Sequence, residues 1–190
     1  MTCPSPLINL DLSRPMWVFG YGSLIWSPDF PVAERRLATA RGWRRSFCLQ
    51  SIHHRGTPEA PGLVLALDED ATAECQGLAL RVAPGAESET LAMLRERELV
   101  TSAYLERELP LLTREGESLT ALAYVIDPSH AQYTGAMDPE EQAHIILRAK
   151  GGRGFNRDYL WSTVAHLEEL GVQDPELAAL AARVRALASE

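Results

Sequence analysis

The chain has 190 residues, of which 46% are hydrophobic and 23% are charged, and its net charge is -8 with the histidines neutral. This length suffices for one domain with a substantial core, and the acidic balance with scattered basic residues argues against a nucleic acid as partner. No apolar run approaches the ~20 residues that cross a bilayer, so a membrane partner is not expected either. We therefore expect one soluble domain over residues 1–190.

Residues 1–15 are expected to form an irregular N-terminal arm. They lack the basic start and apolar segment of a secretory signal, so the cytoplasm is the predicted location. Three cysteines, Cys3, Cys48 and Cys75, are odd in number and far apart in the sequence. This spacing indicates reduced structural thiols instead of a disulfide framework or a zinc ribbon.

A β-prone run over residues 16–26 is interrupted by two glycines and a serine. The pattern predicts a strand at about residues 16–21 and then a tight loop, because glycine permits dihedral angles and close approaches that a Cβ forbids. Successive N–H groups of such a loop can converge on a carboxylate or a tetrahedral oxyanion. A glycine-rich hairpin turn without that function explains the same residues equally well. The loop residues are Tyr21, Gly22, Ser23 and Leu24.

The segment from residue 32 to residue 83 is predicted to contain a helix and three strands. Residues 32–40 are rich in alanine, glutamate and arginine, which favours a helix that ends at Gly42. Strands are predicted over residues 43–52, 62–67 and 75–83, the last two joined by a turn at residues 68–71.

The predicted loop between the first two of these strands contains the adjacent histidines His53 and His54. Neighbouring side chains on an extended chain point apart, and no cluster of cysteines or carboxylates accompanies the pair. We therefore expect no metal site here.

Residues 87–99 are predicted to form a helix whose last turn carries Glu98. Leu91 and Leu94 share one stripe at the 3.6-residue period, and Glu98 falls on that stripe. Burial raises the pKa of a carboxyl group by disfavouring its charged form, which suits proton transfer near neutral pH. A structural alternative stays open, in which the helix ends earlier or Glu98 pairs with a neighbouring arginine. Those arginines are Arg95 and Arg97.

Two further strands are predicted over residues 101–112 and 119–126. Tyr104 would begin the first of them close to Glu98. Tyr124, on the second, is explained either as a residue of the same pocket or, more commonly for tyrosine, as part of the core.

The last third of the chain is predicted to be helical. Asp138 and Asp174 are each followed by proline, the pattern of a helix N-cap and first turn. Asn156 is predicted to cap a helix between these two. Strands followed by helices indicate an α+β domain built on an antiparallel or mixed sheet.

Four motifs occur in the order found in a known enzyme family. The first is Phe19-Gly20-Tyr21-Gly22-Ser23-Leu24, and the second is Arg55-Gly56-Thr57-Pro58-Glu59-Ala60-Pro61-Gly62. The third is Arg97-Glu98 followed by Tyr104, and the fourth is Gly151-Gly152-Arg153-Gly154-Phe155-Asn156-Arg157-Asp158-Tyr159-Leu160. Over about residues 16–180 the chain therefore resembles the γ-glutamylcyclotransferases, in particular their ChaC-like, glutathione-degrading branch.

The resemblance implies a small, partly closed β-barrel with flanking helices. It also implies that the chain converts glutathione to 5-oxoproline and Cys-Gly, with no cofactor and no metal. The substrate's own α-amine would attack the γ-carbonyl while Glu98 serves as general acid and base. Substrate-binding roles are implied for eight residues: Tyr21, Gly22, Ser23, Leu24, Arg55, Tyr104, Asn156 and Tyr159.

For several of these positions a purely structural explanation stays open. Arg55, which would bind a distal carboxylate of the leaving dipeptide, is equally well explained as a surface arginine. Asn156 and Tyr159 are explained nearly as well by a helix cap and a packing aromatic.

Three rival functions also stay open. One is a cyclotransferase that acts on another γ-glutamyl compound, because the segment after Glu98 lacks the paired glycines of some family members and Gly151-Gly152-Arg153 replaces a more usual Gly-x-Ser. A second is a non-catalytic binder of γ-glutamyl compounds. A third is a serine hydrolase that uses Ser23, although the loop is not the Gly-x-Ser-x-Gly elbow. The sequence does not predict an oligomeric state.

Overall fold

The computed structural model describes residues 7–189, which divide into two compact units. The barrel unit comprises residues 7–45 and 67–131, and the helical unit comprises residues 46–66 and 132–189. The boundaries fall inside two long strands, β2 (Val32–Ser51) and β3 (Gly62–Val82), which contribute residues to both units. The single domain over residues 1–190 stays a prediction, and Cys3 lies outside the described residues.

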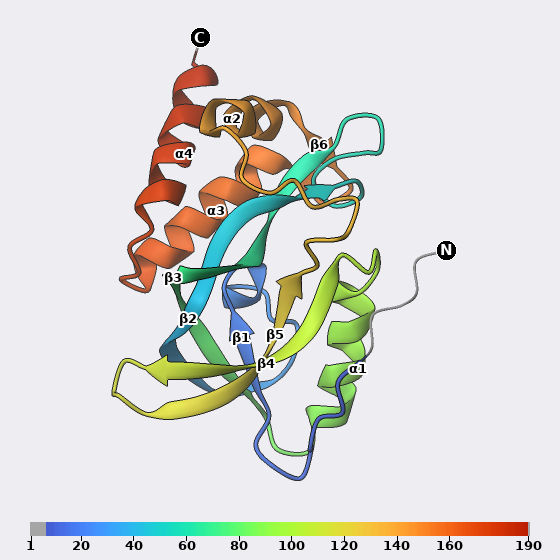
Figure 1. The fold of residues 1–190 in the computed structure, drawn as a ribbon, viewed down its shortest axis with the longest axis vertical. Helices are drawn as coiled ribbons and strands as arrows, with labels where there is room; N and C mark the ends of the chain where they lie inside the picture. Colours follow the sequence, from blue (N-terminus) through green and yellow to red (C-terminus); the bar gives the residue numbers. More distant parts are fainter. Residues whose placement is uncertain (1–6, 190) are drawn as a thin grey trace. The chain divides into compact units, whose positions relative to one another are not determined.

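Five strands close into a mixed barrel (Figure 1). Besides β2 and β3 they are β1 (Trp17–Gly20), β4 (Tyr104–Thr113) and β5 (Ser118–Ile126), and their order is β1-β3-β2-β4-β5. The pairs β1–β3, β2–β4 and β4–β5 are antiparallel, whereas β5 pairs in parallel with β1 and with β3. Helix α1 (Glu87–Glu98) connects β3 to β4. The predicted α+β barrel fold is confirmed.

The helix predicted over residues 32–40 is wrong, because this segment is the first half of β2. Glu34 and Arg36 form an ion pair across 2.5 Å, and their spacing of two residues places side chains on the same face of a strand. Arg36 also pairs with Glu117 at the start of the β5 region. The pairing of β2 with β4 in the barrel outweighs a weak helix preference. Gly42 does not end a helix but lies inside the strand at φ 79°, a left-handed value that favours glycine.

The turn predicted at residues 68–71 is also wrong, because β3 runs through it without a break. Acidic residues are rare in strands, but here they face arginines of the neighbouring strand β2. Arg44 lies 4.0 Å from Asp70, and Arg41 lies 3.0 Å from Glu74. The acidic residues of this segment thus lie on the exposed side of one long hairpin.

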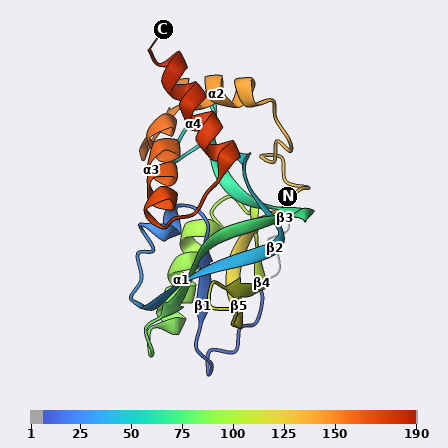
Figure 2. The same cartoon turned by 90° about the vertical axis from the view of Figure 1, so that its left-hand side faces the viewer.

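The helical unit contains α2 (Pro139–Arg148), α3 (Asn156–Glu169) and α4 (Pro175–Leu187). Two short strands, β6 (Lys150–Gly151) and β7 (Gly154–Phe155), pair between α2 and α3. The three helices pack against one another, and Figure 2 shows α3 beside α4. Within residues 7–189, no helix combines the length and the hydrophobicity needed to cross a bilayer.

The predicted aspartate caps of α2 and α4 are confirmed. Asp138 accepts hydrogen bonds from two N–H groups in the first turn of α2, and Asp174 accepts one in the first turn of α4. The predicted Asn156 cap is wrong. Phe155 holds the N-cap position of α3, and Asn156 is the buried first residue of the helix, whose side chain bonds to another strand.

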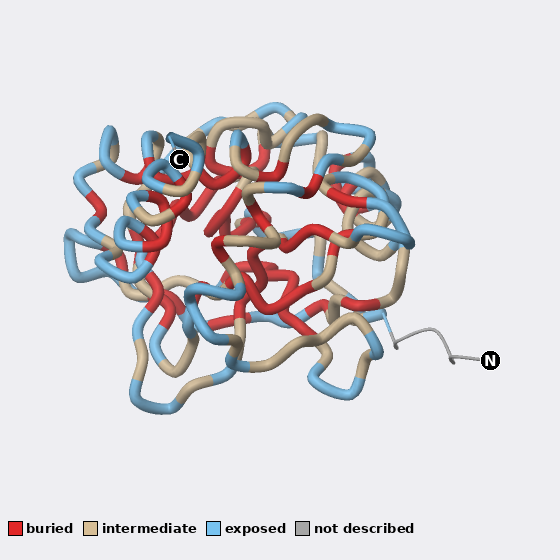
Figure 3. Tube along the Cα trace, turned by 90° about the horizontal axis from the view of Figure 1, so that it is seen from above, coloured by how far each residue is buried: buried red, intermediate tan, exposed pale blue. Residues whose placement is uncertain are grey.

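Each unit buries its own apolar core, which Figure 3 shows in red along the chain. Cys48 and Cys75 are among the buried side chains, as the sequence predicted for structural thiols. In the barrel unit the fully buried side chains include Val18, Phe19, Leu80, Leu94 and Leu122, and in the helical unit they include Ile146, Leu160, Leu167 and Val184.

Candidate functional site

The glycine-rich loop after β1 forms a single 3-10 turn, Ser23–Ile25, which confirms the predicted tight loop. The N–H of Ile25 donates to the carbonyl of Gly22 at 2.9 Å, and the N–H of Ser27 donates to the carbonyl of Ser23 at 2.8 Å. The first N–H groups of such a turn, those of Ser23 and Leu24, have no partner within it. The loop therefore presents amide donors at its start.

The base of this loop is held by close backbone packing. A Cβ on Gly77 of β3 would lie 2.4 Å from the carbonyl oxygen of Gly20, so only glycine fits there. Arg45 is buried, and its Nε donates to the carbonyl oxygen of Tyr21 at 2.6 Å. The hydroxyl of Tyr21 donates to the carbonyl oxygen of Tyr124 at 2.7 Å. These bonds fix where the loop leaves the barrel.

Glu98 is the last residue of α1, and its side chain is only 19% exposed. Leu91 and Leu94 are buried, which confirms the predicted apolar stripe. The carboxylate Oε1 lies 3.1 Å from Nε of Arg97, so the ion pair that the sequence left open as an alternative is present. A largely buried carboxylate therefore stands at the end of the stripe and is held by its neighbour.

Arg97 links Glu98 to the glycine-rich loop. Besides its contact with Glu98, its Nη2 donates to Ser23 Oγ at 3.0 Å, and its Nη1 donates to the carbonyl oxygen of Ser27 at 2.8 Å and to Asp29 Oδ2 at 2.7 Å. The side chain of Arg97 is 11% exposed. One planar guanidinium thus fixes the end of α1 against the loop, with a fork geometry that a lysine cannot reproduce. Sequence patterns gave no signal of this role, because the partners lie about 70 residues away in the chain.

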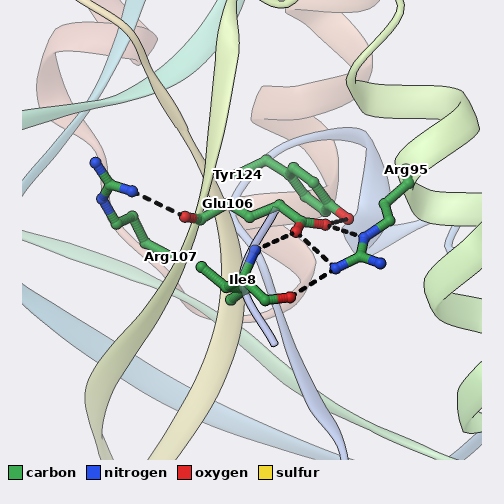
Figure 4. Close-up of polar contacts among 5 residues, drawn as sticks. All are labelled: Ile8, Arg95, Glu106, Arg107 and Tyr124. Atoms are coloured by element: carbon green, nitrogen blue, oxygen red, sulfur yellow. Dashed lines mark hydrogen bonds and ion pairs between the residues drawn. The ribbon is translucent and has the colours of Figure 1, made fainter. Parts of the chain in front are cut away.

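Tyr104 begins β4, as predicted, and faces Ile126 of β5 in the strand pairing. The chain turns between α1 and β4 at Ser102, whose φ is 57°. Further along these strands, the buried side chains of Glu106 and Tyr124 contact each other, and Arg95 of α1 binds Glu106 (Figure 4). Glu106 lies two residues after Tyr104 on β4, and the sequence did not indicate that its carboxylate would be buried.

In the helical unit, Arg55 and Tyr159 lie together. The Arg55 guanidinium is centred 5.2 Å from the Tyr159 ring, and its Nη1 donates to the carbonyl oxygens of Arg153 at 2.6 Å and Phe155 at 3.3 Å. Burial lowers the pKa of Arg55 from its ordinary value. The Tyr159 ring is buried and packs in a T-shaped arrangement with Phe47, with the two ring centroids 5.9 Å apart. Arg55 is therefore a partly desolvated cation on an aromatic face and not a freely solvated surface arginine.

Asn156 has a structural position in the same unit. Its side chain is fully buried, its Nδ2 donates to the carbonyl oxygen of Leu63 at 2.7 Å, and its Oδ1 accepts from the N–H of Leu63 at 2.7 Å. A Cβ on Gly62 would lie 2.7 Å from this Oδ1. Asn156 thus joins the start of α3 to the start of β3, and its role in substrate binding stays a prediction.

The adjacent histidines His53 and His54 are both exposed in the loop between β2 and β3. Among residues 7–189, no group of three or more histidine, cysteine or acidic side chains is arranged to hold a metal ion.

Within the barrel unit the structure thus joins the glycine-rich loop to Glu98 through Arg97, and it places Tyr104 on the strand that follows α1. Within the helical unit it joins Arg55 to Tyr159. The largely buried Glu98 carboxylate is linked through Arg97 to a loop that presents amide donors. Such groups can transfer protons and stabilise developing negative charge.

Comparison with known proteins identifies one family. A sequence model described as ChaC-like protein matches residues 16–187. The chain is 36% identical over 176 residues to the glutathione-specific γ-glutamylcyclotransferase of Escherichia coli, covering 93% of this chain and 75% of that protein. It is 34% identical to γ-glutamylcyclotransferase 2-3 of Arabidopsis thaliana, covering 92% and 91%. The crystal structure of a yeast γ-glutamylcyclotransferase specific to glutathione has a similar fold, with a TM-score of 0.82 and 23% identity over 90% of this chain and 96% of that one.

Proposed function

The chain belongs to the ChaC-like protein family, and from this premise we propose that it is a γ-glutamylcyclotransferase that converts glutathione to 5-oxoproline and Cys-Gly. The Escherichia coli relative is named as glutathione-specific, which supports the substrate, and the Arabidopsis thaliana relative is named as a γ-glutamylcyclotransferase, which supports the reaction. The observation that carries the mechanism is the position of Glu98, largely buried at the end of α1 and tied through Arg97 to the glycine-rich loop.

The reaction needs no nucleophile from the protein, because the substrate carries its own. The α-nitrogen attacks the γ-carbonyl carbon, and the amide bond between that carbon and the cysteinyl nitrogen breaks. Two protons leave the α-ammonium nitrogen in all, and two reach the departing nitrogen, so the reaction consumes neither water nor net protons. Glu98 is the group that receives and returns these protons, and the tether between nucleophile and carbonyl supplies the proximity.

The barrel unit offers two further aids to this reaction. The N–H groups at the start of the 3-10 turn can stabilise the oxyanion that forms during attack. Arg97 holds Glu98 against the loop that carries these amides. Ser23 Oγ accepts a hydrogen bond from Arg97, an arrangement that suits an anchoring residue better than the nucleophile of a serine hydrolase.

Substrate-binding roles for Arg55, Tyr104, Asn156 and Tyr159 stay predictions of the family resemblance. The partial desolvation of Arg55 supports its assignment to a carboxylate, because a guanidinium removed from water gains more from an anionic partner. A cytoplasmic location also stays a prediction from the residues, and cell fractionation tests it.

The test is incubation of purified, chelator-treated protein with glutathione, followed by mass detection of 5-oxoproline, Cys-Gly and glutamate. We expect 5-oxoproline and Cys-Gly in equal amounts. Glutamate with Cys-Gly would instead indicate a hydrolase. If glutathione is unchanged, a panel of other γ-glutamyl compounds distinguishes altered specificity, which gives 5-oxoproline from another substrate, from a binding-only protein, which gives none.

A further inference from the structure

The barrel unit buries a second carboxylate, Glu106, whose side chain is 1% exposed. A buried charge is costly unless it is paired and its oxygens are hydrogen-bonded. Arg95 meets this need with two hydrogen bonds, from Nε to Oε1 at 2.8 Å and from Nη2 to Oε2 at 3.0 Å. The mechanism described above does not use this carboxylate.

Two more donors complete the surroundings of Glu106 (Figure 4). The N–H of Ile8 donates to Oε2 at 3.3 Å, and the Tyr124 hydroxyl donates to Oε1 at 3.1 Å. Arg95 Nη2 also donates to the carbonyl oxygen of Ile8 at 2.8 Å, so the segment that enters β1 is part of the same cluster. Glu106 and Tyr124 are direct neighbours in the β4–β5 pairing, which fixes the distance between the two side chains.

This geometry determines what the Tyr124 hydroxyl can do. A carboxylate paired with arginine only accepts hydrogen bonds, so the single phenol proton of Tyr124 is committed to Glu106. The phenol oxygen is left as an acceptor toward any other partner. Without Glu106 the same hydroxyl would be free to rotate and donate, and it would then suit an anionic or carbonyl group equally well.

The charge of Glu98 also acts on this phenol. Burial raises the pKa of Tyr124, and the charge of Glu106, the hydrogen bond to it and the charge of Glu98 raise that pKa further. Tyr124 therefore stays protonated at neutral pH, so it does not replace Glu98 as a base. A phenol oxygen that is oriented by Glu106 and that also feels the charge of Glu98 favours a cationic donor.

We propose that Glu106 is a positioning residue that holds the Tyr124 phenol as a hydrogen-bond acceptor for the α-ammonium group of the substrate, beside Glu98. The inference rests on the proposed function for the identity of that substrate. It assigns a specificity to the cluster: compounds with a free α-amine are favoured over compounds in which this amine is missing. Arg95 contributes by holding the Glu106 side chain in its place.

The experiment compares glutathione with its deaminated analogue, in which hydrogen replaces the α-ammonium group. Kinetics give kcat and KM for glutathione, and competition gives the inhibition constant Ki of the analogue. The proteins are the wild type, Glu106→Gln, Tyr124→Phe and the double variant, with Glu108→Gln as a control because Glu108 is exposed on the same strand. The quantity compared is the ratio of the analogue's Ki to the KM of glutathione.

We expect this ratio to fall roughly 10- to 100-fold in Tyr124→Phe, the effect of losing one hydrogen bond to a charged group. It should fall by less in Glu106→Gln, because the glutamine oxygen still accepts the phenol proton. The analogue's Ki should stay unchanged, because the analogue has no ammonium group that could donate a hydrogen bond to Tyr124. In the double variant the ratio should fall no further than in Tyr124→Phe. In Glu108→Gln it should equal the wild-type ratio. Equal weakening of glutathione and the analogue, or an unchanged ratio in Tyr124→Phe, would overturn the proposal.

Two features keep the result interpretable. Tyr124→Phe leaves the ion pair between Glu106 and Arg95 intact, so it tests the proposal even where Glu106→Gln fails to fold. If the wild type turns over no γ-glutamyl compound, the proposed function fails. Calorimetry then gives the dissociation constants of glutathione and of the analogue, and their ratio takes the place of the kinetic one. The failure of the function and the failure of the amine site are thus observed in different quantities.

Discussion

We expect Arg97 to support turnover by holding Glu98 in position, and the substitution Arg97→Lys tests this. Lysine keeps the positive charge but presents its donors from one nitrogen, so it cannot reach Ser23, Ser27 and Glu98 together. We expect kcat to fall roughly 10- to 100-fold, because a displacement of a catalytic group by about 1 Å costs up to about 100-fold.

The effect on stability follows from the same contacts. The bonds from Arg97 to Ser23 Oγ and to the Ser27 carbonyl are partly buried, and a hydrogen bond from a charged donor contributes about 1.5 kcal/mol. The pair with Asp29, whose side chain is 55% exposed, adds little. Arg97→Met should therefore lower the free energy of unfolding by about 3 kcal/mol, and Arg97→Lys by about half of that.

The assay is steady-state turnover of glutathione beside denaturant unfolding, with Arg114→Lys as a control because Arg114 is exposed in the turn between β4 and β5. The informative comparison is a double-mutant cycle with Glu98→Gln. If Arg97 acts by placing Glu98, Arg97→Lys should lower kcat in the wild type but hardly at all in Glu98→Gln. Equal losses in both backgrounds would refute this reasoning.

Three further substitutions test the loop and the packing. Gly22→Val should impair turnover more than it lowers the melting temperature, because it crowds the amide loop; proportionate losses in kinetics and calorimetry would make this glycine merely structural. Asn156→Ala leaves the N–H and carbonyl of Leu63 buried without partners and should cost about 2–4 kcal/mol in urea unfolding, and a loss below about 0.5 kcal/mol would contradict that. Gly77→Ala places a Cβ 2.4 Å from the Gly20 carbonyl oxygen and should cost about 1–3 kcal/mol; an unchanged unfolding midpoint would show that the strands can separate there.

The features that sequence reasoning predicted well are local ones. The caps at Asp138 and Asp174 were predicted because the capping side chain and the N–H groups it satisfies lie within three residues of each other. The stripe that ends at Glu98 was predicted because it depends only on the helical period. The family assignment came from four ordered motifs, and it is confirmed by the match over residues 16–187.

The features that sequence reasoning missed depend on partners far away in the chain. The extended conformation of residues 32–40 depends on the neighbouring strands of the barrel, which local composition cannot reveal. Asn156 was given the wrong local role because its partner, Leu63, lies 93 residues earlier. The contacts of Arg97 and the burial of Glu106 likewise follow from the arrangement of β4, α1 and the loop after β1. Only the folded barrel shows which charges are buried.

The measurement that tests the central claim most directly is the turnover of glutathione by Glu98→Gln. Glutamine keeps the shape of the side chain and an oxygen that can accept a hydrogen bond from Arg97, but it cannot take up a proton. We predict that kcat falls on the order of 10²- to 10⁴-fold while the protein stays folded, and that Glu96→Gln, at an exposed position on the same helix, keeps full activity. Full turnover by folded Glu98→Gln would contradict the assignment of Glu98 as the acid and base of the reaction.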